Sequence, residues 1–237
     1  MAKHGKKYQL AKEKVGEGAR LPKEAVALMK SVSFANFDES VELHIHTSAD
    51  VRHAEQQIRE VVSLPHGTGK TVRVLVFAEG LAADAAVEAG ADYVADAEII
   101  KKIEGGWAEF EVAVATPDQM GKIGRLGRYL GRKGLMPNPR TGTVVQPGEI
   151  AGAIEQARQG RVELRMDKTA IVHTAIGRVS FEEDALVENL TTVVTTLLRA
   201  KPDQVKGQLI KKATIATTMG PGIQLDLSEL ELESRAV

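Results

Sequence analysis

Hydrophobic and polar positions follow two different patterns along this chain. The middle of the chain has short β-rich runs that alternate with helical patterns, at 71–77, 81–89, 93–95, 98–103 and 110–115. A further amphipathic helix is expected from Pro147 to Gly160. Strand–helix–strand order predicts parallel strands joined by right-handed crossovers, with helices on both faces of the sheet. This part of the chain is therefore predicted to be a three-layer α/β/α domain.

The two ends of the chain have a different pattern. Two helices are expected at the N-terminus, and the segment 41–46 then alternates apolar and polar residues, as a strand with one buried face does. The other end has strands at 170–179 and 208–217 with an amphipathic helix between them, and Ser180 with Glu183 predicts a capping box at the start of that helix. Neither end has enough strands to bury its own apolar face, so the two ends are expected to fold together.

These patterns predict a two-domain protein of mixed α/β and α+β class. Residues 1–67 and 160–237 would form a split α+β domain built from both chain ends, and residues 68–159 would form the inserted domain. Two adjacent linkers make a hinge, and motion between the domains is the default expectation unless their interface is large. The candidate hinge residues, where the chain crosses between the domains, are His66, Gly67 and Gly160.

The composition is that of a globular protein with a sizeable core. Of the 237 residues, 43% are hydrophobic and 27% are charged. The absence of Cys excludes disulfides and Cys-based zinc sites. No apolar run approaches the roughly 20 residues that a membrane span needs, and the basic N-terminus lacks the apolar stretch of a signal peptide. A cytoplasmic protein with no membrane partner is expected.

The formal net charge of −1 hides an uneven distribution of charge. Residues 226–237 hold four acids and one Arg. Residues 119–148, the cationic segment, hold no acid and six basic residues, which are Lys122, Arg125, Arg128, Arg132, Lys133 and Arg140. The glycines between these cations would let them approach a polyanionic backbone closely, and sequence-independent phosphate contacts are usually made in this way. The alternative is a solvated loop whose charges serve solubility.

No segment carries a complete catalytic or cofactor motif, and no catalytic residue is assigned. Gly67–Thr71 contains Gly-Lys-Thr, but Leu64 stands where a phosphate-binding loop needs its first Gly, and the segment precedes a strand rather than a helix. The first strand of the middle domain lacks the dinucleotide fingerprint, so no cofactor is expected. Glu42, His44 and His46 share one strand face, but three ligands in a row converge poorly, so no metal is expected. An α/β enzyme that binds a phosphorylated small molecule or nucleotide at the glycine segment is the alternative function.

Several segments occur in the order found in one known family. They are Ser63–Lys70, Ala89–Val94, Gly134–Pro139 with Gly142–Val144, Asp167–Thr169 with Ile171–His173, and Thr217–Pro221. Through these matches, which extend from Lys3 to about Gly222, the sequence resembles the family of large-subunit ribosomal protein one, the protein of the mobile ribosomal stalk. The resemblance implies a non-enzymatic protein, monomeric when free, that binds large-subunit ribosomal RNA of the 23S type through its split domain. It also implies a Rossmann-like inserted domain without a dinucleotide, assistance in releasing deacylated tRNA from the exit site, and repression of translation through the leader of its own messenger RNA.

The residues that match the family's RNA-binding positions come from both ends of the chain. The ribosomal-RNA candidates are Phe37, Ser40, Glu42, His44, Lys168, Thr169, His173, Thr217, Thr218, Met219 and Gly220. The cationic segment falls in the inserted domain, so it is predicted to be a secondary surface for exit-site tRNA or flanking RNA. One departure from the family is Asn36, where a Lys is usual, and the missing cation should weaken RNA binding and lower its salt slope by about one unit.

Overall fold

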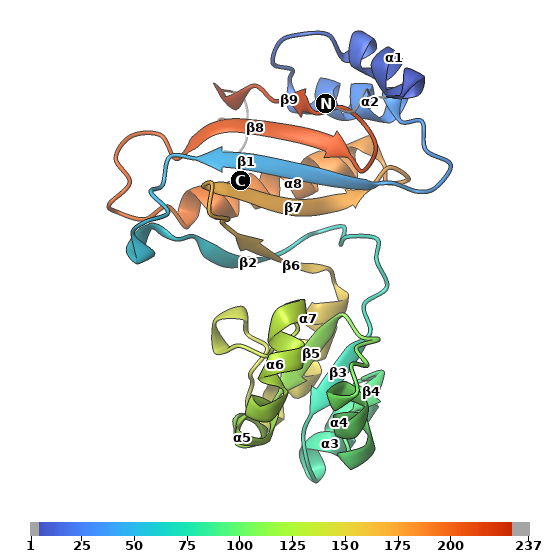
Figure 1. The fold of residues 1–237 in the computed structure, drawn as a ribbon, viewed down its shortest axis with the longest axis vertical. Helices are drawn as coiled ribbons and strands as arrows, with labels where there is room; N and C mark the ends of the chain where they lie inside the picture. Colours follow the sequence, from blue (N-terminus) through green and yellow to red (C-terminus); the bar gives the residue numbers. More distant parts are fainter. Residues whose placement is uncertain (1–4, 229–237) are drawn as a thin grey trace. The chain divides into compact units, whose positions relative to one another are not determined.

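The computed structural model describes residues 5–228. Its contacts divide the chain into two compact units, both of which are drawn in Figure 1. The terminal unit consists of the described residues up to Gly69 and those from Val162 onward, and the inserted unit consists of Lys70–Arg161. Most of the acidic stretch at 226–237 lies outside the described residues. Within the described part of the chain, no helix is long and apolar enough to cross a membrane.

A four-stranded antiparallel sheet lies at the centre of the terminal unit. Its strand order is β7-β1-β8-β9, with β1 at Ser40–Thr47, β7 at Ile171–Arg178, β8 at Ile210–Thr217 and β9 at Ile223–Gln224. The register places His44 of β1 beside His173 of β7 and Thr214 of β8. A strand from the N-terminal part of the chain therefore lies between two strands from the C-terminal part, as Figure 1 shows.

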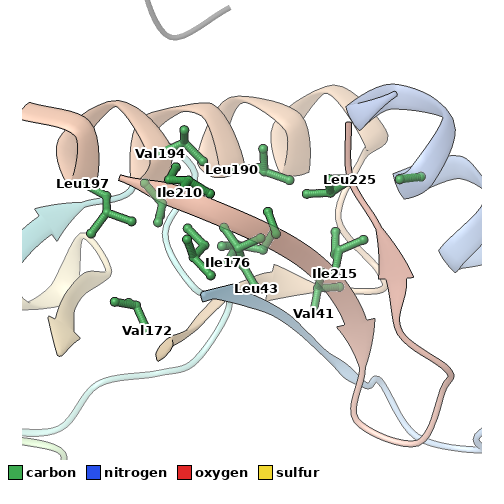
Figure 2. Packing of buried hydrophobic residues seen from close by; sticks show 14 of the residues in the cluster. Val41, Leu43, Val172, Ile176, Leu190, Val194, Leu197, Ile210, Ile215 and Leu225 are labelled. Carbon is green, nitrogen blue, oxygen red and sulfur yellow. The ribbon is translucent and has the colours of Figure 1, made fainter. Parts of the chain in front are cut away.

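Helices cover one face of this sheet. The helices of the terminal unit are α1 (Lys6–Val15), α2 (Pro22–Val32) and α8 (Glu183–Arg199). The inward side chains of β1, those of Val41, Leu43 and Ile45, are fully buried in one core with α2 and α8, and α1 packs on α2. Figure 2 shows side chains of this core between α8 and the sheet, among them Leu43, Ile176, Leu190 and Val194. The other face of the sheet points away from α2 and α8.

A second, two-stranded sheet also belongs to this part of the chain. It pairs β2 (Arg59–Ser63) with β6 (Arg161–Arg165), and the short 3-10 helix η1 (Ala54–Gln56) precedes β2. The hydrophobic pattern does not predict either strand. Each strand buries a single side chain, Val62 or Leu164, so neither shows the alternation that indicates a strand.

A three-stranded parallel sheet in the order β4-β3-β5 lies at the centre of the inserted unit. Its strands and main helices are β3 (Val74–Phe77), α3 (Leu81–Glu88), β4 (Tyr93–Val94), α4 (Ala97–Glu104), β5 (Val112–Ala115) and α7 (Ile150–Arg158). Alternate side chains of β3 enter two separate cores. Val74 and Val76 pack with α3 and α7, whereas Leu75 and Phe77 pack with α4 and the segment after β5. The predicted parallel strands with helices on both faces are confirmed.

The cationic segment folds mainly into short helices. They are η2 (Pro117–Gln119), α5 (Met120–Ile123), η3 (Gly124–Leu126), α6 (Gly127–Leu130), η4 (Gly131–Lys133), η5 (Pro139–Thr141) and η6 (Pro147–Glu149). Repeated glycines disfavour one continuous helix here. Ile123, Leu126 and Leu130 recur every three or four residues and are buried, so the basic residues between them point outward.

The capping box predicted at Ser180 and Glu183 is wrong. α8 begins at Glu183 with Glu182 as its N-cap residue, which makes no side-chain capping bond. The Ser180 hydroxyl instead donates to the Asp38 carboxylate at 2.8 Å, and the Ser180 N–H donates to the same carboxylate at 3.0 Å. Ser180 therefore binds the loop before β1, and local spacing cannot reveal a partner that lies 142 residues away.

Candidate nucleic-acid interface

The outward side chains of the four-stranded sheet form a polar surface, which we call the open face. Along β1 burial alternates, so Glu42, His44 and His46 point away from α2 and α8 and are half-buried among their neighbours. On β8 the outward residues Lys212 and Thr214 pair with His46 and His44. Such a surface offers hydrogen-bonding groups in regular rows, which suits a polar partner more than an apolar one.

Two imidazoles meet in the middle of the open face. His44 and His173 occupy opposite positions on β1 and β7, and their Nδ1 atoms lie 2.8 Å apart, so one ring donates to the other. Glu42 Oε2 lies 3.7 Å from His44 Nε2. Burial lowers the pKa of His44, the charge of His173 lowers it further, and Glu42 opposes both effects. His44 is therefore neutral at pH 7.

Lys168 and Thr169 lie in a tight turn between β6 and β7. The Asp167 carboxylate accepts hydrogen bonds from the Thr169 hydroxyl at 2.7 and 2.8 Å, and from the N–H groups of Thr169 and Ile171 at 2.8 Å each. These bonds, that of the Thr169 hydroxyl foremost, lower the pKa of Asp167 to about 2. Ala170 has φ +62°, the one positive φ of a non-glycine residue in the described part of the chain. The turn is tightly fixed, and Lys168 is exposed on it.

The segment Thr217–Gly220 forms a close-packed turn at the end of β8. The Thr218 hydroxyl accepts a hydrogen bond from the Ser40 N–H at 3.1 Å, and the Thr218 N–H donates to the Ser40 carbonyl at 3.1 Å. A Cβ at Gly220 would overlap the Thr217 hydroxyl, so this position has no room for a side chain. Thr217 is only 5% exposed, so its side chain lies beneath the turn rather than on the surface.

Glu39 joins this turn to the loop before β1. Its buried carboxylate accepts hydrogen bonds from the Met219 N–H at 2.9 Å, the Ser33 hydroxyl at 2.8 Å and the Ala35 N–H at 3.2 Å. Burial alone would raise the pKa of Glu39, but these hydrogen bonds outweigh burial and lower the pKa, so the carboxylate is ionised. The sequence-based list of site residues misses Glu39. Glu39 lies two residues before Val41, so the alternating pattern already places it on the inward face. A buried acid needs hydrogen-bond donors, and this could have marked Glu39 as a site residue.

Two large apolar side chains are exposed on the segments that Glu39 joins. Phe37 is 56% exposed and Met219 is 51% exposed. The backbone beside Phe37 is fastened, since the Asp38 carboxylate accepts the two hydrogen bonds from Ser180. An aromatic ring on a fixed loop can stack on an unpaired base, and a flexible Met side chain can adapt to an irregular surface.

Except for Thr217, whose side chain is buried, the predicted ribosomal-RNA residues lie along one surface of the terminal unit. At the Ser40 end of β1 are Phe37, Ser40, Thr217, Thr218, Met219 and Gly220. Glu42, His44 and His173 continue from there along the open face. The turn with Lys168 lies beyond the His46 end of β1, about 20 Å from Ser40 at the usual rise of a strand. A surface of this length can follow several nucleotides.

The cationic segment belongs to the inserted unit, whereas the predicted ribosomal-RNA residues belong to the terminal unit. Lys122 is paired with the Glu79 carboxylate, which lowers the pKa of Glu79, and Lys133 Nζ donates to the Gly106 carbonyl at 3.2 Å. The side chain of Arg140 lies outside the described part of the structure. The remaining basic side chains are exposed, and they are Arg125, Arg128 and Arg132.

The candidate hinge residues His66 and Gly67 are bound to α8 within the terminal unit. The fully buried Asn189 side chain accepts a hydrogen bond from the His66 N–H at 3.1 Å and donates to the carbonyls of Gly67 at 3.0 Å and Ile176 at 2.8 Å. Gly160 follows α7 with φ +91°, a conformation that favours glycine. Asn189 thus fixes the chain where it leaves the terminal unit.

The glycine segment 67–70 does not form a phosphate-binding loop. It precedes β3, and no helix begins between it and that strand. A Cβ at Gly69 would overlap Arg178 and Phe181, so this backbone is packed against side chains. Among residues 5–228, no group of three or more His, Asp or Glu side chains is placed to bind a metal ion.

A mixed α+β chain with an extended polar face and a separate basic segment has the features of a binding protein. A profile of the family described as Ribosomal protein L1p/L10e matches residues 29–221. The chain therefore belongs to the Ribosomal protein L1p/L10e family, as the sequence motifs predict. It is a ribosome-associated structural protein of the large subunit and not an enzyme.

Three relatives share nearly the whole length of this chain, and each is named Large ribosomal subunit protein uL1. The protein of Thermomicrobium roseum is 55% identical over 237 residues, which cover 99% of this chain and 98% of the relative. That of Dehalococcoides mccartyi is 54% identical over 228 residues, with 96% of each chain covered. That of Chloroflexus aggregans is 52% identical over 229 residues, which cover 96% of this chain and 97% of the relative. Both units therefore fall within the similarity.

Proposed function

We propose that this protein binds large-subunit ribosomal RNA of the 23S type at the mobile stalk through its terminal unit. The observation that carries the proposal is the buried carboxylate of Glu39, which connects two exposed segments at one end of the open face. Burying an ionised group is costly unless hydrogen bonds compensate it, and here they also hold the backbone at Met219 to the segment that leads to Phe37. Recognition of a folded RNA by its shape requires such fixed contacts.

Different residues serve different parts of the RNA in this proposal. The backbone at Thr218–Gly220 contacts ribose and phosphate, and Gly220 lets this turn pack closely on the Thr217 hydroxyl beneath it. Phe37 stacks on an unpaired base, and Lys168 places a charge near phosphate at the far end of the open face. Thr217 positions the turn from below. Ribose 2′-hydroxyls donate to Glu42 and Thr169, and ribose or phosphate oxygens accept from the remaining polar side chains, which are Ser40, His44 and His173.

The inserted unit carries the secondary surface in this proposal. The split RNA-binding domain, predicted from the sequence at residues 1–67 and 160–237, is the terminal unit, and the Rossmann-like inserted domain, predicted at 68–159, is the inserted unit. The cationic segment contacts exit-site tRNA and helps deacylated tRNA to leave. The terminal unit also represses translation by binding the leader of the protein's own messenger RNA. The free protein is a cytoplasmic monomer, and its hinge lies at the crossings marked by His66, Gly67 and Gly160, with Asn189 holding the first crossing to the terminal unit.

Gel-shift titration with a stalk fragment of the large-subunit RNA, repeated at increasing salt, tests the ribosomal-RNA contact. Thr218→Val removes the hydroxyl that accepts the Ser40 N–H, and we expect a loss of affinity of about 10-fold. Thr192→Val is the matched control, because Thr192 lies on α8, which covers the face of the sheet opposite the open face. A wild-type protein without a specific complex at moderate salt, or equal losses in both variants, would contradict the proposal. Titration of the messenger leader in parallel tests the repression.

A further inference from the structure

A cavity of about 440 Å³ opens on the inserted unit between the end of α4 and the short helices α6 and η4. Its lining includes Trp107, Arg128, Tyr129, Arg132 and Lys133. Binding sites for small organic groups occupy roughly 300–1,000 Å³ and combine apolar walls with a few placed polar groups. The cavity has the size and the mixed lining for a ligand with a flat ring and a charged part.

Every charged side chain that lines this cavity is basic. Arg128, Arg132 and Lys133 all belong to the cationic segment, and all are exposed. The hydrogen bond from Lys133 Nζ to the Gly106 carbonyl joins two lining residues, so the Lys133 charge lies at the cavity. Three cations without a lining carboxylate favour an anionic ligand.

A second cavity of the same unit has different chemistry. It has a volume of about 510 Å³ at the carboxyl ends of β3 and β4, and the carboxyl residues Glu79 and Asp96 line it. The cation there, Lys122, is paired with Glu79. The basic lining is therefore a property of the cavity beside Trp107 and not of cavities in this unit generally.

Trp107 and Tyr129 give the first cavity aromatic walls. Trp107 is half-buried, and its ring is supported by Tyr93 edge-on with ring centroids 5.1 Å apart and by Phe110 at 5.6 Å. Tyr129 is 38% exposed. A base can stack on a supported aromatic ring whatever its identity, because every base has a π-face.

We propose that this cavity binds one unstacked base of single-stranded RNA, with the flanking phosphates at Arg128, Arg132 and Lys133. This inference rests on the proposed role of the cationic segment as an RNA surface and states which part of the RNA it takes. A duplex presents phosphates but keeps its bases stacked and paired, so it could use the cations and leave the aromatic walls empty. A single strand uses both.

The chain has a single Trp, so the emission of Trp107 reports on this cavity directly. We expect a short single-stranded oligoadenylate to quench that emission when it is titrated into the full-length protein at constant moderate salt. Tyr129→Ala and Arg132→Gln should each raise the Kd for oligoadenylate about 10-fold, and both variants keep Trp107 as the fluorescent reporter. Arg125→Gln is the matched control for Arg132→Gln, because Arg125 is exposed in the same segment but does not line the cavity, and its Kd should change less than about threefold.

Three results would overturn the inference. They are equal quenching by an RNA duplex, equal effects of Arg132→Gln and Arg125→Gln, and binding of adenosine monophosphate as tight as that of the oligonucleotide, which would assign the cavity to free nucleotides. The stalk RNA fragment is titrated with the same preparations to separate the two proposals. Stalk-RNA binding without any quenching by oligoadenylate would remove this inference alone, and quenching without stalk-RNA binding would remove the proposed ribosomal-RNA contact alone.

Discussion

The Glu39 carboxylate accepts a hydrogen bond from the Met219 N–H at 2.9 Å, across 180 residues of sequence. The same carboxylate accepts hydrogen bonds from Ser33 and Ala35, in the segment that leads to Phe37. One buried acid thus joins the two backbone segments that carry the exposed apolar side chains of the proposed RNA contact. Stability of the terminal unit and the proposed recognition of RNA should consequently depend on the same residue.

Glu39→Gln is expected to weaken both properties. The substitution removes the charge and replaces one acceptor oxygen with a donor, so we expect the free energy of unfolding to fall by about 2 kcal/mol and stalk-RNA affinity to fall at least about 10-fold. Urea denaturation and gel-shift titration measure the two effects. The control is Glu13→Gln on the exposed side of α1, which should change stability by less than about 0.5 kcal/mol. A destabilised Glu39→Gln protein with unchanged RNA affinity would separate this residue from the RNA contact.

Gly220→Ala is expected to distort the turn after β8. The new Cβ would overlap the Thr217 hydroxyl, so the backbone must shift, at a cost of about 1–3 kcal/mol in stability and a loss of RNA affinity. Thermal denaturation and gel-shift titration measure these changes. Gly152→Ala, inside α7 with no heavy atom near its Cβ position, is the control and should be neutral or stabilise by up to about 1 kcal/mol. Wild-type stability and affinity for Gly220→Ala would show that the turn has room that the structure does not indicate.

Local periodicity records which side chains are buried, and this is why much of the fold could be predicted from the sequence. The alternation in β1 predicts that Val41, Leu43 and Ile45 point inward, and the structure buries all three. The same alternation also predicts that Glu39 points inward, but it does not predict which groups donate hydrogen bonds to this buried acid. One of those donors belongs to Met219, which approaches Glu39 only after the chain ends have folded together.

The candidate site depends even more on distant pairing. His173 lies against His44 because β7 pairs with β1, and the two residues are 129 positions apart in the sequence. No spacing rule links the two histidines, so only the family resemblance, and not periodicity, predicts both of them as RNA-binding residues. The strands β2 and β6 could not be predicted for a different reason. Each strand buries a single side chain, which is too few to produce a periodic hydrophobic pattern.

Acidification is expected to destabilise the His44–His173 pair. The folded pKa of His44 lies below its ordinary value of 6.5, so as the pH falls through that value the unfolded state binds more protons, and stability falls until the folded protein is protonated as well. The free energy of unfolding, measured by urea denaturation across this pH range, should depend less steeply on pH in His44→Gln than in the wild type. In NMR titrations His173→Asn should raise the pKa of His44, because it removes a neighbouring positive charge. His53→Gln, at an exposed histidine outside the sheet, should leave the His44 midpoint unchanged.

Asn189→Leu is expected to destabilise the terminal unit at the point where the chain leaves it. The variant would leave the His66 N–H and the carbonyls of Gly67 and Ile176 without their side-chain partner, at a cost of about 2–4 kcal/mol. Glu188→Gln is an informative control at the same junction. The pair between Glu188 and His66 is largely solvent-exposed, so its loss should cost less than about 1 kcal/mol. Equal effects of the two variants in urea denaturation would contradict the role given to Asn189.

Neutralising the cationic segment is expected to weaken stalk-RNA binding only modestly. The stalk contact is proposed for the terminal unit, so Arg128→Gln, Arg132→Gln and Lys133→Gln combined should cost less than about 5-fold in affinity. Lys168→Gln removes one proposed phosphate contact, in the turn before β7, and should lower the salt slope by about one unit. Gel-shift titrations at several salt concentrations measure both affinity and slope. Loss of all specific stalk-RNA binding in the triple variant, with Lys168→Gln unaffected, would reverse the assignment and make the inserted unit the main ribosomal-RNA contact.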